Sequence, residues 1–400
     1  MTKPADALQR LRRVHEETVV GMLRSYGALS RTDLMRLTGL SRTTLFAIIS
    51  EMIERGAAVE TEAAVTGARG RGRPASLVAL NPSAGLLLGI DLGRRRVRVA
   101  VANVAHEVVA TAMADVPVDA GVAEQADAAA DLVRRLCLER GIRLDALDAV
   151  GVGVVGVVDG AEKEAAGAVP RATPAVYLPV TERLEREFGV RIAIDNNARL
   201  AALAESTWGA ARSVADVIYV RWSVGVGGGF IVGGRLVRGA HSAAGELGHV
   251  SLDPDGPPCH CGSRGCLEGR IGHQGLLDAA AARGVSLGSI DELVAAAQDR
   301  VPAVCEVVSA AAADLGRILA DAVVQLDPAR VVVGGELSAL GSLVLDPVRA
   351  AIATLALPNA PRRIDVVPAD LGANASAMGA VALLLHEEPA VPRHLRPAAR

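Results

Sequence analysis

The chain has 400 residues, a formal net charge of −3 and 50% apolar residues, so it is long enough for two or three domains with a sizeable core. Its apolar runs are strand-length and broken by charges and glycines, which argues against a membrane span, and the first residues lack the apolar segment of an export signal. We therefore expect a soluble, cytoplasmic protein with no membrane partner.

Charge is divided unevenly along the chain. Residues 1–80 carry 12 Lys and Arg against 8 Asp and Glu, whereas the remainder carries 30 against 37. A basic N-terminal part on an acidic body is typical of a DNA-binding domain joined to a body that does not bind DNA.

The N-terminal part predicts a helix-turn-helix. Apolar residues at helical spacing over 16–26 predict a first helix. Ser30 is expected to cap a second helix that ends at Gly39, and Ser41 to cap a third with one apolar stripe. A helical hairpin used only for packing would explain this stripe, but it would not explain the polar face of the third helix.

That polar face carries the candidate DNA contacts. One arginine among short polar side chains suits the floor of a major groove, where Arg42 could donate two hydrogen bonds to guanine. Short strands are expected at 58–62 and 77–80. The Gly-Arg run 67–75 between them suits a wing tip in the minor groove, or alternatively a flexible linker. The predicted DNA-binding residues are Ser41, Arg42, Thr43, Thr44, Arg69, Arg71 and Arg73.

Beyond residue 83 the pattern alternates between strands and helices, which predicts an α/β fold. The first elements expected are strands at 86–93, 97–104 and 107–114, a helix at 122–140 and a strand at 149–156. Glycine-rich runs at 223–230 and 331–341 each accompany an apolar strand. We interpret them as turns that approach a phosphate or nucleoside.

A metal site is the strongest local prediction. His249, Cys259, Cys261 and Cys266 supply one imidazole and three thiolates within 18 residues, a set that matches a closed tetrahedral zinc site. Because no coordination position is left open, the zinc is expected to be structural. It would order the Gly- and Pro-rich loop 249–266.

Together these motifs resemble the ROK family (repressors, open reading frames and sugar kinases), and specifically its regulator branch. The resemblance covers roughly residues 15–385. It rests on LSRTDLMRLTGLSRTTL, RGRPA, GIDLG, VGVGGG and GELGH, and above all on CHCGSRGCLEG. It implies a winged helix followed by a two-lobed, actin-like (sugar kinase/ribonuclease H-like) body with a ligand cleft between the lobes, usually as a homodimer or homotetramer.

The resemblance also implies a sugar site. Matched to the family motifs, its contacts fall on Asn196, Asn197, Glu246, His249 and Glu268. An asparagine that often accompanies these residues is missing, because the corresponding segment 171–175 reads RATPA. The alternative is that the five residues only brace the zinc loop and the junction of the lobes.

The kinase chemistry of the family is predicted to be lost, so that no residue is catalytic. Family kinases read approximately DLGGTK at the first phosphate loop, where this chain has Arg94, Arg95 and Arg96 after Gly93. Arginines there obstruct the close approach of the phosphates to the backbone. Within IDNNARLAALAE, Asn197 takes the place of the catalytic aspartate, and an amide cannot accept a proton near neutral pH.

The sequence thus predicts a repressor of carbohydrate genes that binds an inverted-repeat operator in double-stranded DNA and responds to a sugar or sugar-derived effector. We expect a winged helix over 1–82, the kinase-like body over 83–385 and a disordered tail over 386–400. The rival hypotheses are an active ATP-dependent sugar kinase with a DNA-binding head, and a scaffold that binds another protein.

Overall fold

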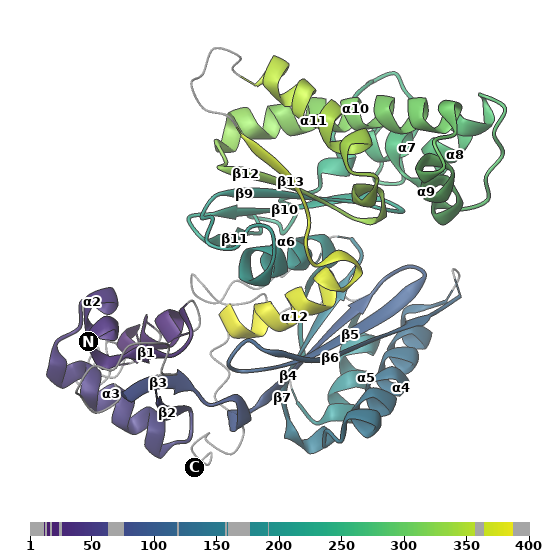
Figure 1. The fold of residues 1–400 in the computed structure, drawn as a ribbon. Coiled ribbons are helices and arrows are strands. Elements are labelled where there is room, and N and C mark those ends of the chain that lie inside the picture. The colour runs from purple at the N-terminus through teal and green to yellow at the C-terminus, as the bar shows by residue number, and fades with distance from the viewer. Residues whose placement is uncertain are drawn as a thin grey trace.

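The computed structural model describes residues 12, 14–16, 18–23, 26–62, 76–117, 120–156, 158, 177–190, 192–356 and 364–386. Figure 1 shows a small N-terminal head beside a body of two stacked lobes. The predicted wing tip at 67–75, the segment 171–175 and the tail beyond residue 386 lie outside the described residues. In the described part of the chain, no helix is both long and apolar enough to cross a membrane.

The head is a winged helix-turn-helix. Its elements are β1 (Leu29–Ser30), α2 (Arg31–Thr38), α3 (Arg42–Glu54), β2 (Ala58–Glu62) and β3 (Ser76–Leu80), with sheet order β1-β3-β2. Both predicted caps are present: the Ser30 hydroxyl accepts from the Asp33 amide at 3.1 Å, and the Ser41 hydroxyl from the Thr44 amide at 3.2 Å. The apolar stripe of α3 is buried against the strands.

Each lobe of the body contains a five-stranded sheet. The first has the order β6-β5-β4-β7-β8 and the second β11-β10-β9-β12-β13. In both sheets the first three strands in sequence pair antiparallel and the last two add in parallel. This repeated topology is the actin-like arrangement that the family resemblance implied.

The strands of the first lobe are β4 (Leu86–Leu92), β5 (Arg96–Asn103), β6 (Val108–Asp115), β7 (Leu147–Val154) and β8 (Ile192–Asn196). Those of the second are β9 (Val217–Trp222), β10 (Val226–Val232), β11 (Arg235–Val237), β12 (Arg330–Gly334) and β13 (Asp365–Pro368). Short 3₁₀ turns are η1 (Pro82–Ala84), η2 (Leu144–Ala146), η4 (Leu247–His249), η5 (Glu336–Leu340) and η6 (Gly372–Asn374).

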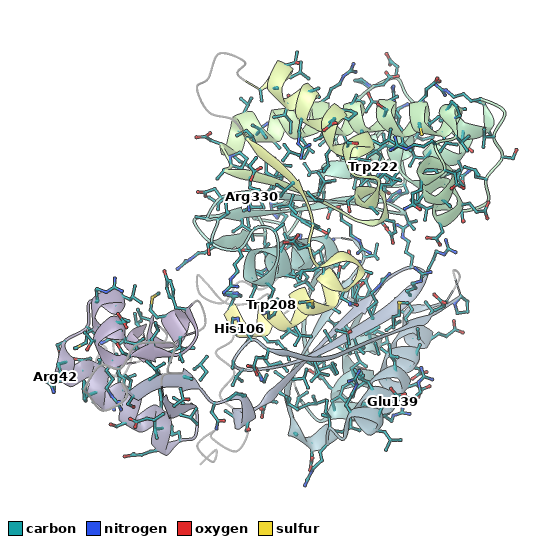
Figure 2. The ribbon with its side chains drawn as sticks, in the orientation of Figure 1. Arg42, His106, Glu139, Trp208, Trp222 and Arg330 are labelled. Carbon is teal, nitrogen blue, oxygen red and sulfur yellow. The ribbon has the colours of Figure 1, made fainter. Side chains whose placement is uncertain are left out.

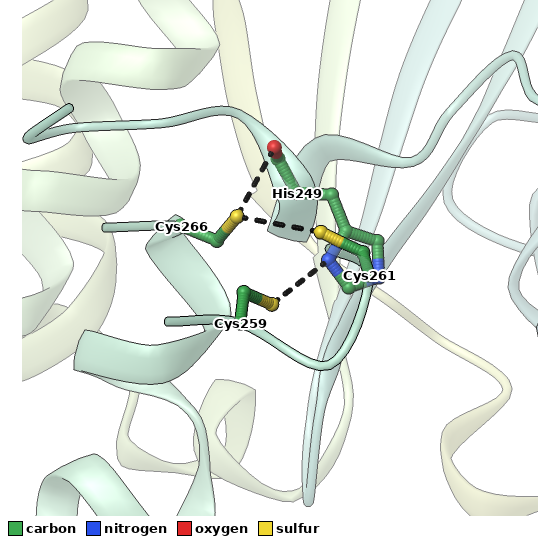
Figure 3. Close-up of side chains that lie close together, drawn as sticks. All are labelled: His249, Cys259, Cys261 and Cys266. Carbon is green, nitrogen blue, oxygen red and sulfur yellow. Dashed lines mark hydrogen bonds between the residues drawn. The ribbon is translucent and has the colours of Figure 1, made fainter. Parts of the chain in front are cut away.

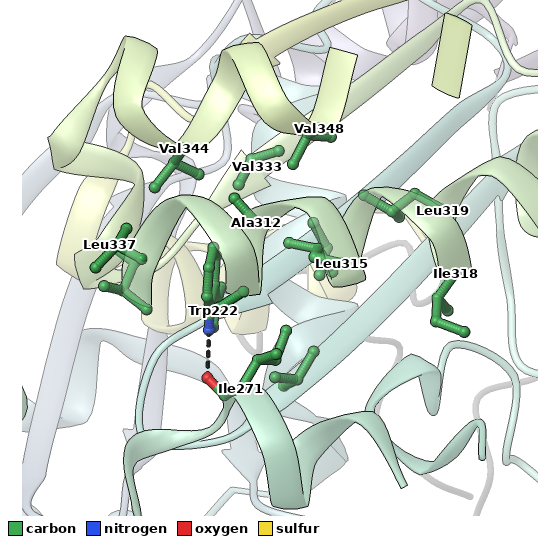
Figure 4. Close-up of a cluster of buried hydrophobic side chains, with 14 of the residues drawn as sticks. Trp222, Ile271, Ala312, Leu315, Ile318, Leu319, Val333, Leu337, Val344 and Val348 are labelled. Carbon is green, nitrogen blue, oxygen red and sulfur yellow. Dashed lines mark hydrogen bonds between the residues drawn. The ribbon is translucent and has the colours of Figure 1, made fainter. Parts of the chain in front are cut away.

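Helices cover the outer faces of both sheets. The first lobe carries α4 (Val122–Arg140) and α5 (Leu178–Phe188). The second carries α7 (Leu267–Ile271), α8 (His273–Ala281), α9 (Ile290–Gln298), α10 (Pro302–Leu326) and α11 (Ser342–Leu355). Figure 4 shows the core beneath α10 and α11, where the indole of Trp222 is fully buried and donates to the Ile271 carbonyl at 2.8 Å.

Two helices, α6 (Asn197–Trp208) and α12 (Ala375–His386), lie between the two sheets (Figure 1). They touch through their backbones: a Cβ on Gly379 would lie only 1.8 Å from the Leu200 carbonyl oxygen. Gly229 of β10 approaches α6 in the same way, since its Cβ would lie 2.7 Å from that of Ala202. Helix α6 is therefore held tightly between the lobes.

The interpretation of 223–230 as a glycine turn was wrong in part. Gly227, Gly228 and Gly229 lie within strand β10, and none of them has a positive φ. Their small size is needed for packing, because a Cβ on each would contact α6 or the loop that precedes η4 at under 3.0 Å. Glycine in a sequence does not reveal whether the backbone needs left-handed geometry or only space.

Candidate functional site

The four predicted zinc ligands converge at one point of the second lobe (Figure 3). The donor atoms of His249, Cys259, Cys261 and Cys266 all lie within 4.8 Å of one another. The Cys261 and Cys266 sulfurs are 3.7 Å apart, as are the Cys259 sulfur and the His249 Nδ1.

These separations fit a tetrahedral zinc ion. Zn–S bonds of about 2.3 Å and Zn–N bonds of about 2.0–2.1 Å place ligand sulfurs about 3.8 Å apart, and a sulfur and a nitrogen about 3.6 Å apart. A second group, formed by His249, His260 and Glu268, also lies within 4.8 Å but shares His249 with the first. Three thiols and an imidazole are the softer and more complete donor set, so we assign the metal position to them.

The local chain geometry places these donors. The Cys259 amide donates to Ser263, and the Leu267 amide donates to Val250, which closes the loop on itself. Burial raises the pKa of the Cys266 thiol to about 11, whereas a hydrogen bond from the Ser263 backbone lowers the pKa of Cys261. Because zinc binds thiolates, metal binding at this cluster would release thiol protons.

The five residues predicted to contact a sugar line a single cleft between the lobes. The cleft has a volume of about 160 Å³, and Asn196, Asn197, Glu246, His249 and Glu268 all lie on its wall. Glycine-rich backbone from Val224 to Gly227 forms another part of the wall. The structure therefore brings together residues from β8, α6, η4 and α7 that the sequence places as much as 72 positions apart.

The two asparagines occupy the start of α6. The Asn196 side chain caps the helix by accepting from Ala198 and Arg199, and its amide donates to the Gly156 carbonyl at 2.9 Å. The amide of Asn197, which is 7% exposed, donates to Asp91 at 3.3 Å. Both side chains are thus fixed at the floor of the cleft.

The opposite wall comes from the zinc loop and its neighbours. Glu268, on α7 directly after the ligand Cys266, accepts from the Val226 amide at 2.8 Å. His249 has its Nδ1 toward Cys259 and its Nε2 3.9 Å from a Glu246 oxygen, so one imidazole belongs to both the metal cluster and the cleft.

A buried ionic network connects the two walls. Asp195 and Arg199 are each 1% exposed, and Asp195 accepts from Arg199 at 2.8 Å and from Arg238 at 2.7 Å. Arg199 also donates to the Ser242 carbonyl at 2.5 Å. Paired and hydrogen-bonded in this way, the charges hold the loop leading to Glu246 against the start of α6.

Several cleft residues escaped the sequence analysis. Arg98, Arg221, His260, Asp291 and Glu336 all line the cleft. His260 stands between two of the predicted zinc ligands in the sequence, which was a usable signal. The others come from two strands, helix α9 and the 3₁₀ turn η5, so only the folded chain brings them together.

In the head, the exposed face of α3 carries Arg42 and Thr43, and Figure 2 shows Arg42 at the edge of the head away from the body. The Arg42 guanidinium lies 5.3 Å from the centre of the Phe46 ring, which also contacts Arg31 at 5.1 Å. The hydroxyls of Ser41 and Thr44 are hydrogen-bonded to each other at the start of the helix, and the Thr44 amide donates to Ser41. Arg69, Arg71 and Arg73 lie outside the described residues.

Comparison with known proteins agrees with this architecture. Residues 87–387 match the model of the ROK family. The chain is 27% identical to the xylose repressor of Caldicellulosiruptor bescii over 357 residues, which cover 86% of this chain and 88% of that protein. It is 30% identical to the glucokinase of Streptomyces coelicolor over 332 residues, which cover 76% of this chain and 99% of the enzyme.

Among solved structures, a ROK family transcriptional regulator described as a homologue of the Escherichia coli Mlc protein superimposes with a TM-score of 0.77 at 24% identity. The superposition covers 94% of this chain and 97% of that one, so it includes the head as well as the body. The glucokinase, by contrast, matches only about three quarters of this chain. Because the family model matches residues 87–387, well over half of its length, the chain belongs to the ROK family.

Proposed function

We propose that this chain is a DNA-binding transcriptional regulator, acting as a repressor of carbohydrate metabolism genes, whose body binds a sugar or sugar-derived effector without phosphoryl transfer. The observation that carries this proposal is Asn197, which takes the place of the proton acceptor in a chain that also has a winged helix. The likeness to the xylose repressor over 86% of this chain and 88% of that protein supports it. The 30% identity to glucokinase favours the kinase as the second candidate.

The assignment of residues follows from this proposal. We place the DNA-binding domain at 1–82 and the body at 83–385, with a structural zinc ion held by His249 and the three cysteines. We assign sugar contacts to the asparagines, Glu246, His249 and Glu268. Through His249 and Glu268, zinc would stabilise the cleft wall without taking part in any reaction.

Helix α6 offers a route from the cleft to the head. It begins at Asn197 in the cleft and ends at Trp208, whose indole donates to the His106 carbonyl at 2.8 Å (Figure 2). His106 lies in the turn between β5 and β6, where Ala105 packs against the apolar core of the head. A ligand that shifts α6 would therefore move the surface on which the head rests.

The effector hypothesis predicts that a carbohydrate changes operator affinity. We expect at least one monosaccharide or sugar phosphate to alter the affinity about 5- to 150-fold, the range of typical allosteric coupling. Gel-shift titration of the full-length protein against a panel of these compounds measures this. In Asn197→Ala the response should be lost while affinity for DNA without ligand is retained. If no compound changes the affinity, the effector hypothesis fails and DNA binding remains.

A second prediction concerns base recognition by α3. In a dimer or tetramer, two of these recognition helices would bind the two halves of an inverted repeat, with the half-sites about 34 Å apart. We expect Arg42→Ala to lose about 1–3 kcal/mol of discrimination at one position of each half-site. Selection of bound sequences from a randomised operator library measures it.

The matched control is Arg36→Ala, on the preceding helix, where the side chain is 72% exposed. It should leave the base preference intact and at most weaken binding to all sequences alike. An unchanged base preference in Arg42→Ala would show that α3 does not read the operator through this residue.

A further inference from the structure

One end of the cleft is lined by arginines from both lobes. Arg94 and Arg95 lie in the turn between β4 and β5, Arg96 and Arg98 lie on β5, and Arg221 lies on β9. Neither these arginines nor Gly93 has a positive φ, so the turn contains no left-handed residue. What it presents to the cleft instead is guanidinium groups.

Arg98 is the most unusual of these side chains. It is 4% exposed, and its only ion pair in the described part of the chain is a long one, 3.4 Å from Nη1 to Asp91. Its buried Nε has no hydrogen-bond partner among the described residues. A buried guanidinium with an unused donor is costly unless a ligand completes its hydrogen bonds.

Arg98 also lies close to the predicted sugar contacts. Asp91, which is fully buried, accepts from Asn197 with one oxygen at 3.3 Å and contacts Arg98 with the other at 3.4 Å. A single carboxylate therefore separates the sugar end of the cleft from the arginine end. A substituent on a carbohydrate held at Asn197 would extend to the arginines.

The carboxylates that line the cleft near these arginines leave several guanidinium N–H donors without an acceptor among the described residues. Arg96 pairs with Asp115 at 2.8 Å, and Asp291 and Glu336 also line the cleft. Among the described residues, however, Arg94 and Arg95 make no side-chain ion pair, and Arg221 donates only to the Ser376 hydroxyl at 3.3 Å. Paired guanidinium forks with free N–H groups match the oxygens of a phosphoryl dianion.

We propose that this arginine end is an anion subsite for the phosphoryl group of a monophosphorylated carbohydrate. The proposal rests on the proposed function, because it specifies which form of sugar the cleft binds. A free phosphate ion offers the same chemistry, and the experiment must separate the two sources.

The test is calorimetry on the full-length protein with neutral monosaccharides, their monophosphates and inorganic phosphate. We expect at least one monophosphate to bind about tenfold or more tightly than its parent sugar, as one charge-assisted hydrogen bond of about 1.4 kcal/mol would give. The double variant Arg94→Gln/Arg95→Gln should lose this preference while binding of the neutral sugar stays unchanged.

Two further variants guard against trivial explanations. Arg98→Lys retains the charge beside Asp91 but lacks the fork, so it should also reduce the preference while the protein stays folded by circular dichroism. Arg143→Gln, whose side chain is 80% exposed and pairs with Asp145, should behave as wild type.

The outcomes are distinguishable. Neutral sugars that bind as tightly as their monophosphates would overturn the anion subsite and leave the proposed function intact. Inorganic phosphate that binds as tightly as any sugar phosphate would also overturn it, because the carbohydrate would then contribute nothing. A preference that survives in the arginine variants would place the phosphoryl group elsewhere. Absence of all binding would count against the subsite and the effector hypothesis together.

Discussion

Replacing Cys261 with serine is expected to remove the bound zinc and to lower the melting temperature by roughly 6–12 °C, corresponding to about 3 kcal/mol. Structural zinc contributes on the order of 10 kcal/mol in isolated zinc-finger peptides. Here the loss should be smaller, because the loop keeps backbone hydrogen bonds such as that from Leu267 to Val250. Elemental analysis and thermal unfolding measure the two effects.

The Cys261→Ser substitution should also disturb the cleft wall. Cys266 immediately precedes α7, which carries Glu268, and His249 closes η4 beside Glu246. Without the metal, both segments lose their common anchor, so carbohydrate binding should weaken as well. Cys305→Ser is the matched control, since Cys305 lies on α10 and is not among the four donors. Wild-type protein purified without chelators that contains no zinc would refute the site.

The purified chain is expected to release no ADP above background with any hexose or pentose. Loss of a general base costs roughly 10²–10⁴-fold in rate, and the Asn197 amide is a donor that is already hydrogen-bonded to Asp91. Arg94, Arg95 and Arg96, which line the cleft, are also expected to obstruct a triphosphate. A coupled ADP-release assay measures this, with a ROK glucokinase as the positive control.

Asn197→Asp should recover at most a trace of activity. The new carboxylate would lie about as close to Asp91 as the amide now does, at 3.3 Å, and repulsion between two carboxylates raises the pKa of one of them. Turnover of about 1 s⁻¹ or faster, which is within the ordinary enzyme range, in either protein would favour the kinase over the regulator.

Local signals in the sequence predicted much of this molecule. Ser30 and Ser41 cap their helices as expected, because a cap depends on residues only three positions apart. The strand 58–62 and the helix 122–140 lie where they were predicted, and the strand predicted at 77–80 begins one residue earlier, at Ser76. The glycines of β10 were misread, because they are needed for close packing against α6 and the segment that begins η4, which are distant in sequence.

By itself, the sequence predicted the His249, Cys259, Cys261 and Cys266 cluster and the helix-turn-helix, since each depends on residue types at short, fixed spacing. Only the tertiary structure decided that Arg98 on β5 and Arg221 on β9 face one cleft, and that Trp208 reaches the turn beside the head. Contacts between such distant segments depend on how the two sheets pack across α6 and α12. Long-range packing of this kind has no periodicity along the chain from which it could be read.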